Sequence, residues 1–480
     1  MLSGTTTLAS SQANDPAIVV GGHQVGVDLD TWPAKIVRAL LRRHYEKSER
    51  RLVARFLDHG ARVVELGTGL GSVALVLSGR TGVEDVLCIE ANPDIARTAF
   101  TNFARNGRAL TLRNQILVAR AHASAGLRDM TLFASPYFLS SSQIRRRDDM
   151  QAVRVPAAVL EDTLEEHGAN GLVIDIEGGE GGLLPDAELD GIDTVILELH
   201  PHVIGVDVCM VAVESLMRQG LRLDISAMDG DVFVFRRDTE GVAAAFEAVE
   251  GEVLRQYLAG RQHEQKGDLH KAVDSYRQAV SLIPACGAVP YALSLVIERC
   301  GALAHAAEAA GAAVEADPSN EDYLEQWANL LAIQGRDEEA LGLYERAATR
   351  ASDRPLFHLA RAAVLERLGR QSEAGQALTA AAALMPEIAD AAGTLARFAT
   401  TEELAPGEMS PEPQKVAAMD SPGFRTALAE ILAERVHMRD ASMALGTALR
   451  QAPDDVDLHH ALILLLARPR DLRKALARVA

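Results

Sequence analysis

The sequence of 480 residues lacks several features that would each have assigned it to a class of protein. It has only four cysteines and no Cys-x-x-Cys pair, which argues against a disulfide framework or a zinc site and favours a reducing compartment. The cysteines are Cys88, Cys209, Cys286 and Cys300. Lysine and arginine number 48 against 67 acidic residues, and the net charge of −19 argues against a protein that binds nucleic acid.

Long apolar runs are also missing, so the sequence predicts no segment that spans a membrane. Residues 1–14 are rich in Ser, Thr and Ala and have no basic start, which argues against a secretory signal. We therefore expect a cytoplasmic protein. No spacing of His, Cys, Asp and Glu is diagnostic of a metal ligand set, and we predict no metal site.

The character of the sequence changes near residue 240, and a chain of this length favours at least two domains. Before that point, β-branched runs such as Val86–Ile89 and Leu172–Ile176 alternate with helix-like stretches. This alternation predicts an α/β fold with a doubly wound parallel sheet. Two later runs, Leu221–Ile225 and Asp231–Arg236, predict a hairpin that adds an antiparallel strand at the end of the sheet.

After residue 240, a repeat of 34 residues emerges in three columns of small residues. The columns are Gly267, Gly301, Gly335 and Gly369; Ala272, Ala306, Ala340 and Ala374; and Ala279, Ala313, Ala347 and Ala381. Glycine suits the turn between two antiparallel helices, and alanine suits positions where helices cross closely. The period and pattern resemble the tetratricopeptide repeat, which implies an all-α solenoid with a concave face that binds a peptide or partner protein.

These patterns divide the chain into five parts. We expect a flexible N-terminal segment at residues 1–30, the α/β domain at 31–240 and four tetratricopeptide-like repeats at 250–388. Several prolines then interrupt the array, and we assign residues 389–422 to this interrupting segment. Residues 423–480 are predicted to form a degenerate repeat and a capping helix.

A glycine-rich segment follows the first predicted strand of the sheet. Gly67, Gly69 and Gly71 allow the backbone to approach a ligand closely, and the helix that follows offers free N–H groups. Glu90 ends the next strand, where an acid can accept hydrogen bonds from both ribose hydroxyls of an adenosine. Glu65 can face an ammonium group but would repel a pyrophosphate. The segment from Glu65 to Gly71 resembles the Glu-x-Gly-x-Gly-x-Gly pattern of the methyltransferase fold, in which the acid faces the ammonium group of methionine. This resemblance favours a methyltransferase over a nicotinamide-dependent oxidoreductase, which stays open as an alternative.

Further motifs between Arg62 and Pro201 resemble the FkbM-like methyltransferases. They are Glu90-Ala91-Asn92-Pro93, Val155-Pro156 with Leu160–Leu164, Leu172–Glu180 and Ile196–His200. The resemblance implies a Rossmann-like seven-stranded methyltransferase sheet, S-adenosyl-L-methionine as methyl donor, and a hydroxyl acceptor on a glycan sugar or a secondary metabolite. The first motif adds Asn92 to Glu65, Gly67, Gly69, Gly71 and Glu90 as a predicted donor-binding residue.

Three residues near the ends of the fourth and fifth predicted strands are candidates for catalysis. Asp175 lies at the edge where open α/β sheets bind ligands, and we predict that it faces the methyl group or the acceptor. Glu177 follows in a glycine-rich turn and is predicted to line the same mouth, or else to cap a helix. His200 is a candidate general base, with a structural hydrogen-bonded histidine as the alternative. Two neighbouring carboxylates are also able to hold a divalent cation.

The function predicted from these motifs is an S-adenosylmethionine-dependent O-methyltransferase whose repeats bind the acceptor or a partner protein. The alternative is a repeat-based interaction scaffold with a degenerate methyltransferase domain. Val173 favours this second possibility, because the related family commonly has lysine there.

Overall fold

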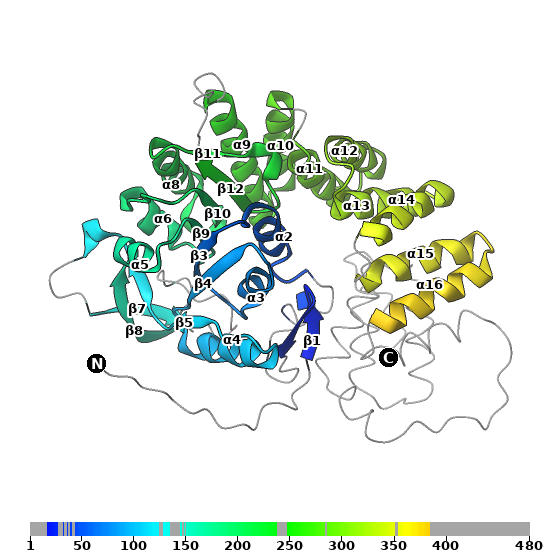
Figure 1. Cartoon of the computed structure of the whole chain (residues 1–480). Coiled ribbons are helices and arrows are strands. Elements are labelled where there is room, and N and C mark those ends of the chain that lie inside the picture. Colours follow the sequence, from blue (N-terminus) through cyan, green and yellow to red (C-terminus); the bar gives the residue numbers. More distant parts are fainter. Residues whose placement is uncertain are drawn as a thin grey trace. The chain divides into compact units, whose positions relative to one another are not determined.

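The structure is a computed structural model that describes residues 17–26, 32, 36, 39–40, 44–123, 128–134, 145, 148, 150–237, 247–283, 286–350 and 354–384. The chain forms two compact units, each with its own core (Figure 1). The first unit comprises Met1–Trp32 and Tyr45–Val242, and the second comprises Pro33–His44 and Ala243–Ala480. The expected α/β region followed by a helical region is confirmed.

The division into units does not follow the predicted boundaries everywhere. Pro33–His44 belongs to the helical unit, although the sequence had placed residues 31–240 in a single α/β domain. The segments predicted at 389–422 and 423–480 lie outside the described residues. Within the described ranges, no helix is long and apolar enough to cross a membrane.

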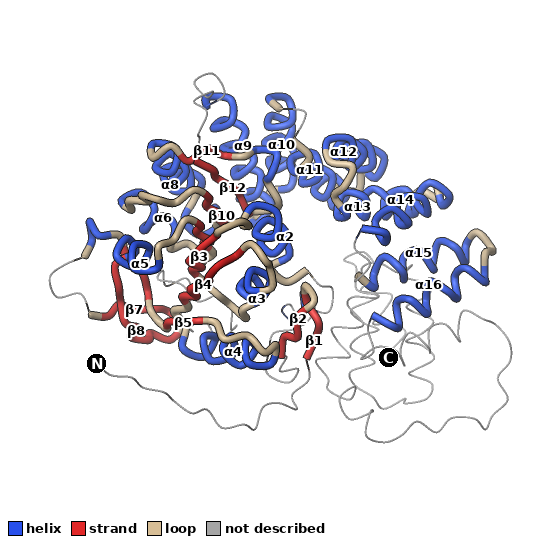
Figure 2. Tube along the Cα trace, in the orientation of Figure 1, coloured by secondary structure: helices blue, strands red, loops and turns tan. Residues whose placement is uncertain are grey.

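A seven-stranded sheet forms the centre of the first unit (Figure 2). Its strands are β3 (Ala61–Leu66), β4 (Val83–Ile89), β5 (Thr111–Arg113), β9 (Gly171–Ile174), β10 (Thr194–Glu198), β11 (Leu221–Leu223) and β12 (Val232–Arg237). They lie in the order β11-β12-β10-β9-β3-β4-β5. The strands from β5 to β10 are parallel, and β12 pairs antiparallel with both β10 and β11.

Helices cover both faces of this sheet, which explains why its central strands are almost continuously apolar. On one face, α2 (Lys47–Phe56), α3 (Ser72–Ser78) and α4 (Pro93–Arg105) share a core with alternate strand residues such as Val63 and Val173. The intervening strand residues, such as Leu172, are equally buried and point to the opposite face, which α5 (Leu160–His167) and α8 (Val206–Arg218) cover.

Two smaller sheets were not expected from the sequence. One contains β6 (Ile116–Val118), β8 (Gln151–Val159) and β7 (Asp129–Ala134) in that order. The other is the hairpin of β1 (Ala17–Val20) and β2 (His23–Gly26). The hairpin is bound to α4 because the Gly26 N–H donates to Asn102 Oδ1 at 2.9 Å. Residues 17–26 therefore differ from the flexible segment that was expected at 1–30.

Eight helices lie within residues 247–384 of the second unit. They are α9 (Glu247–Gln265), α10 (Leu269–Leu282), α11 (Ala288–Arg299), α12 (Leu303–Ala316), α13 (Glu321–Ile333), α14 (Asp337–Arg350), α15 (Pro355–Arg367) and α16 (Gln371–Leu384). The four glycines of the first column end the first helix of each pair with φ between 75° and 83°. The alanines described in the other two columns are almost completely buried. The predicted helix pairs and their 34-residue period are thus confirmed.

Short elements complete the sheet unit. They are the 3-10 helices Arg120–His122, Leu184–Asp186 and Ile225–Ala227, and the helices α6 (Glu180–Leu183) and α7 (Pro201–Ile204). The last 3-10 helix lies between β11 and β12, so the connection of the predicted hairpin is longer than a tight turn.

Candidate active site at the carboxyl edge of the sheet

The predicted site residues follow four neighbouring parallel strands, so the fold brings them to one edge of the sheet. Leu66, Ile89, Ile174 and Glu198 end β3, β4, β9 and β10, respectively. From β3 the chain continues to β4 on one side, whereas β9 lies on the other side and continues to β10. The order of strands therefore reverses between β3 and β9, and open α/β sheets bind ligands outside such a point.

The glycine-rich loop between β3 and α3 is closely packed against the rest of the chain. Gly67, Gly69 and Gly71 have φ values of 84°, 56° and 84°, which favour glycine. A Cβ atom on Gly67 would overlap the backbone carbonyl of Asp175, and one on Gly71 would lie 2.5 Å from the Phe103 ring. The conformation and packing of the loop thus require these glycines whether or not a ligand binds.

The turn before α2 covers this loop, which the sequence did not predict. A Cβ atom on Gly69 would lie 2.6 Å from Glu46 Oε1 and 2.9 Å from the Tyr45 hydroxyl. Ser72 Oγ donates a hydrogen bond to Glu46 Oε2 at 2.6 Å. These contacts join residues more than twenty positions apart, and no motif marked Tyr45 or Glu46 in advance.

The acids predicted to bind the donor are buried beside the loop. Glu65 is only 2% exposed, and its Oε2 has no hydrogen-bond partner among the described residues. Glu90 accepts from the N–H groups of Gly69 and Asn92, at 3.0 and 2.7 Å. Asn92 Oδ1 accepts from the Asp94 N–H and thereby caps α4, so a structural role accounts for this asparagine.

Burial weakens the acidity of the carboxyl groups around the loop. It raises the pKa of Glu46 and of Glu90 to about 7, and burial together with the charge of Glu46 raises the pKa of Glu65 well above its usual value. The nearby negative charge of Asp175 adds to the shifts of Glu46 and Glu90. Such a group of buried acids favours a positively charged ligand and disfavours a phosphate.

Four carboxyl groups surround the His200 ring at the ends of β9 and β10. Its Nδ1 lies 3.1 Å from Glu180 Oε1, within hydrogen-bond distance. Its Nε2 lies 3.6 Å from Asp175 Oδ1, 3.8 Å from Glu198 Oε2 and 4.0 Å from Glu177 Oε2. The structure thus brings together the three residues predicted to be catalytic with Glu180 and Glu198, which belong to the same two motifs.

The charge of His200 follows from these neighbours. Burial alone would lower its pKa, but the hydrogen bond and charge of Glu180, with the charges of Asp175 and Glu177, raise it to about 10. For Asp175, burial raises the pKa to about 7 even though the positive charge of His200 opposes this shift. At neutral pH, His200 is therefore protonated in the free site, and Asp175 titrates.

Backbone strain also coincides with this edge. Among the described residues, only Glu46 and Glu177 combine a side chain with a positive φ, at 45° and 52°. A left-handed backbone is unfavourable for residues other than glycine. Where it occurs in such a residue, it is often at a functional site. Both strained residues direct carboxyl groups toward the region between the glycine loop and His200.

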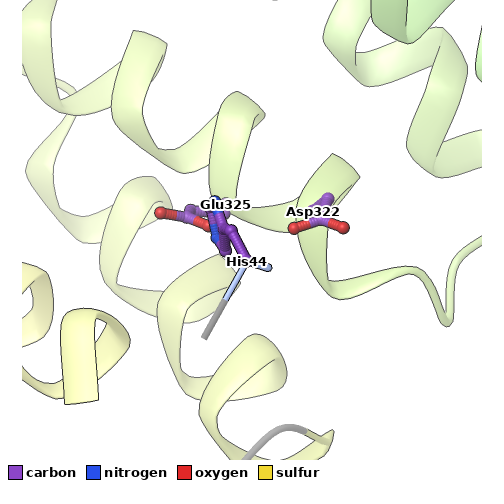
Figure 3. A group of neighbouring side chains, drawn as sticks. All are labelled: His44, Asp322 and Glu325. Atoms are coloured by element: carbon purple, nitrogen blue, oxygen red, sulfur yellow. The ribbon is translucent and has the colours of Figure 1, made fainter. Parts of the chain in front are cut away.

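A second group of His and acidic side chains lies within the helical unit. His44, Asp322 and Glu325 lie close together (Figure 3). Arg354 donates to Asp322 Oδ1 at 2.9 Å and to Glu325 Oε2 at 2.7 Å, and its Nη2 also contacts His44 Nε2. The guanidinium therefore already supplies the positive charge that these carboxylates require.

No family model and no curated protein sequence matches the chain. Similar solved structures include YrrB, described as a TPR protein with an unusual peptide-binding site, with 17% identity and a TM-score of 0.30 over 47% of this chain and 98% of that chain. TTC0263, a thermophilic TPR protein of Thermus thermophilus, shares 21% identity with a TM-score of 0.27, covering 45% of this chain and 98% of that one. MamA shares 16% identity with a TM-score of 0.28, covering 30% and 85%.

Proposed function

We propose that the sheet unit is an S-adenosylmethionine-dependent O-methyltransferase that acts on a hydroxyl of a glycan sugar or a secondary metabolite. The observation that carries this proposal is the group of buried acids around the glycine loop, in which Glu65 Oε2 lacks a hydrogen-bond partner among the described residues. An ammonium group would satisfy this oxygen, whereas the pyrophosphate of a nicotinamide dinucleotide would be repelled.

The topology of the sheet supports the same proposal. The glycine loop follows β3 and Asp175 follows β9, and the order of strands reverses between these two. Glu90 follows β4, the neighbour of β3 on the other side. A nucleoside lying across the carboxyl ends of these strands would meet the loop, Glu90 and Asp175 together.

The chain offers distinct residues for each part of the donor. Glu90 is placed to accept hydrogen bonds from the ribose hydroxyls, since its oxygens keep further acceptor capacity beyond the two N–H groups they already bind. Glu65 and Glu46 are suited to the ammonium group of the methionine part. When bound, S-adenosylmethionine would supply an activated methyl group, so the protein has mainly to align the acceptor and remove its proton.

We assign the removal of that proton to Asp175. A carboxylate with a pKa of about 7 is well matched to accept a proton at neutral pH. His200 was the candidate general base in the sequence, but in the free site it is protonated and has no lone pair to accept a proton. We propose instead that His200 stabilises the negative charges of Asp175 and Glu177, with Glu180 fixing its ring.

The helical repeats are proposed to bind a peptide or partner protein that brings the acceptor to the enzyme. Four helix pairs with a 34-residue period support this role, because stacked units of this kind form extended concave surfaces that bind such partners.

Calorimetric titration of the full chain with S-adenosylmethionine tests the proposed function. We expect the wild type to bind S-adenosylmethionine. Glu65→Gln, which replaces the carboxyl group by an amide of the same shape that cannot ionise, should bind it at least ten-fold more weakly. Glu166→Gln, which removes a surface carboxylate paired with Arg113, should bind as the wild type does. If the wild type shows no binding of S-adenosylmethionine, the interaction scaffold becomes the better account. If the wild type binds NADH instead of S-adenosylmethionine, an oxidoreductase is favoured.

A further inference from the structure

The group around His200 has the geometry of a metal site as well as that of an acid–base site. One donor atom each from Asp175, Glu198 and His200 lies within 4.8 Å of the other two. The Nε2 atom is 3.6 and 3.8 Å from the two carboxylate oxygens, which is too far for a hydrogen bond. Ligands of one ion at metal distances of about 2.1 Å stand about 3 Å apart, so a small inward movement would complete such a site.

The His200 ring is held in the orientation that a metal ligand needs. Its side chain is 6% exposed, and Nδ1 contacts Glu180 Oε1, whose own side chain is fully buried. This fixes Nε2 toward Asp175 and Glu198, and Nε2 forms no hydrogen bond with any residue that the structure describes. A carboxylate that binds the far nitrogen of a histidine is the usual second-layer support of a metal ligand.

Asp175 provides a second sign of a missing partner. Its Oδ1 is buried and has no hydrogen-bond partner among the described residues, and it is the same atom that faces His200 Nε2. A buried carboxylate oxygen without a donor is unfavourable unless a cation or another ligand satisfies it.

The two clusters of His and acids in this chain differ in their supply of positive charge. In the helical unit, Arg354 pairs with both Asp322 and Glu325. Near His200, no lysine or arginine within the described ranges forms an ion pair with Asp175 or Glu198. Glu49 and Glu177 add further negative charge around Asp175. The imidazole is the sole positive group that contacts these carboxylates in the described part of the chain.

We propose that Asp175, Glu198 and His200 bind a divalent cation of the Mn²⁺ or Mg²⁺ class at the carboxyl edge of the sheet. Two carboxylates and one imidazole suit such an ion, and its charge would balance the surrounding acids. Binding would displace the proton of His200, and the charge of the ion would then replace that of the imidazolium beside Asp175 and Glu177. Open coordination positions would face the mouth of the site, where the ion could hold an oxygen of the acceptor. This last role depends on the proposed function, whereas cation binding itself does not.

Electron paramagnetic resonance with Mn²⁺ tests the site directly. The full chain is freed of metal with a chelator and titrated with MnCl₂, and the signal of free Mn²⁺ is followed. We expect one ion to bind per chain, with affinity at least ten-fold lower in Asp175→Asn and in Glu198→Gln. Asp322→Asn, the matched change in the cluster that Arg354 already neutralises, should bind as the wild type does. The spin echo of bound Mn²⁺ should show modulation from imidazole nitrogen.

Several outcomes would overturn the proposal. These are no bound Mn²⁺ at about 1 mM, a weak limit for protein sites; no nitrogen modulation; or binding that is lost in Asp322→Asn but kept in the two site variants. If a site variant fails to fold, the wild-type count and an unchanged nitrogen signal in Asp322→Asn still decide the matter, because His44 gives the second cluster an imidazole of its own. The calorimetric titration with S-adenosylmethionine is done on metal-free protein and interpreted separately. If the chain binds Mn²⁺ but not S-adenosylmethionine, the proposed methyltransferase is refuted and the proposed cation site stands.

Discussion

At the residue scale, the loop between β3 and α3 depends on close approaches of backbone to backbone. Gly67 lies against the carbonyl group of Asp175, and the Gly67 N–H donates to the Ile89 carbonyl at 2.9 Å. One residue thus links the carboxyl ends of β3, β4 and β9. The position of Asp175, and through it the His200 cluster, depends on the absence of a side chain at residue 67.

We therefore expect Gly67→Ala to destabilise the sheet unit strongly. The methyl group would overlap the Asp175 carbonyl, and the positive φ is unfavourable for alanine, so the loss should be at least about 3 kcal/mol. Gly107→Ala is the control, since Gly107 has a φ of 65° but nothing within 4 Å of its Cβ position, and it should lose about 1–2 kcal/mol. Urea unfolding measures the free energy of unfolding of both variants. Equal losses in the two variants would contradict the predicted overlap between the added methyl group and the Asp175 carbonyl.

The buried acids make a second residue-scale prediction, on pH. Burial raises the pKa of Glu49 to about 7 from the usual 4.5, so the folded state binds this proton more tightly than the unfolded state. The stabilisation that protonated Glu49 contributes is full below about pH 4.5 and decreases as the pH rises to about 7. Above that pH, the free energy of unfolding no longer depends on this group. Each such group contributes at most about 1.4 kcal/mol per pH unit.

Urea unfolding at intervals between pH 5 and 8 should show this loss, and Glu49→Gln should reduce its slope. The amide keeps the shape of the buried side chain and cannot ionise. Glu84→Gln, which removes a carboxyl group with a 60% exposed side chain, should leave the slope as it is in the wild type. A Glu49→Gln variant with an unchanged slope would show that this carboxyl group ionises alike in both states.

At the element scale, Arg354 connects two helices of the repeat array. It precedes α15 and pairs with Asp322 and Glu325 on α13, and its guanidinium lies 4.2 Å from the centre of the Phe357 ring. Arg354 and Glu325 are nearly inaccessible, with 3% and 5% exposed side chains. The ion pair therefore lies in surroundings where solvent screens it little.

Arg354→Met should destabilise this part of the array by about 3–5 kcal/mol, because two buried carboxylates would lose their partner. Arg336→Met offers a comparison. Arg336 pairs with Glu339 at 2.6 Å, but both side chains are about half exposed and screened by solvent, so this change should have a much smaller effect. Hydrogen exchange of peptides from α13 and α15 measures both effects locally. Unchanged exchange in Arg354→Met would mean that the pair adds nothing to stability.

The elements that the sequence predicted well have patterns imposed by burial on every side. The central strands, such as β9 and β10, are short apolar runs because helices cover both faces of the sheet. The glycine and alanine columns of the repeats recur because each helix pair has the same turn and the same close crossing. Such local constraints can be recognised in one sequence without knowledge of distant contacts.

The elements that were not predicted lack such constraints. A strand at Val153 was expected, but the sheet that β8 forms with β6 and β7 was not. β8 consists mostly of exposed or half-buried residues and β6 of only three residues, so neither has a distinct apolar alternation. Within the site, the strand ends were predicted because they follow motifs, but Tyr45 and Glu46 reach the loop from the turn before α2. The tertiary packing that brings these residues to the loop cannot be recognised from the spacing of residues in the sequence.

At the scale of the whole molecule, each of the two units has its own hydrophobic core. Domains with separate cores usually unfold in separate transitions. We therefore expect calorimetry of the full chain to resolve two transitions. Gly67→Ala should lower the midpoint of one of them, and Arg354→Met should lower the midpoint of the other.

The proposed donor should act on the same transition as Gly67→Ala. A ligand that binds only the folded state stabilises it by about 2.7 kcal/mol when present at one hundred times its dissociation constant. S-adenosylmethionine should therefore raise the midpoint that Gly67→Ala lowers and leave the Arg354-dependent midpoint in place, because the donor-binding residues all belong to the sheet unit. If both midpoints rise together, the two units fold as one cooperative body, and donor binding is coupled to the repeats that we propose to hold the acceptor's carrier.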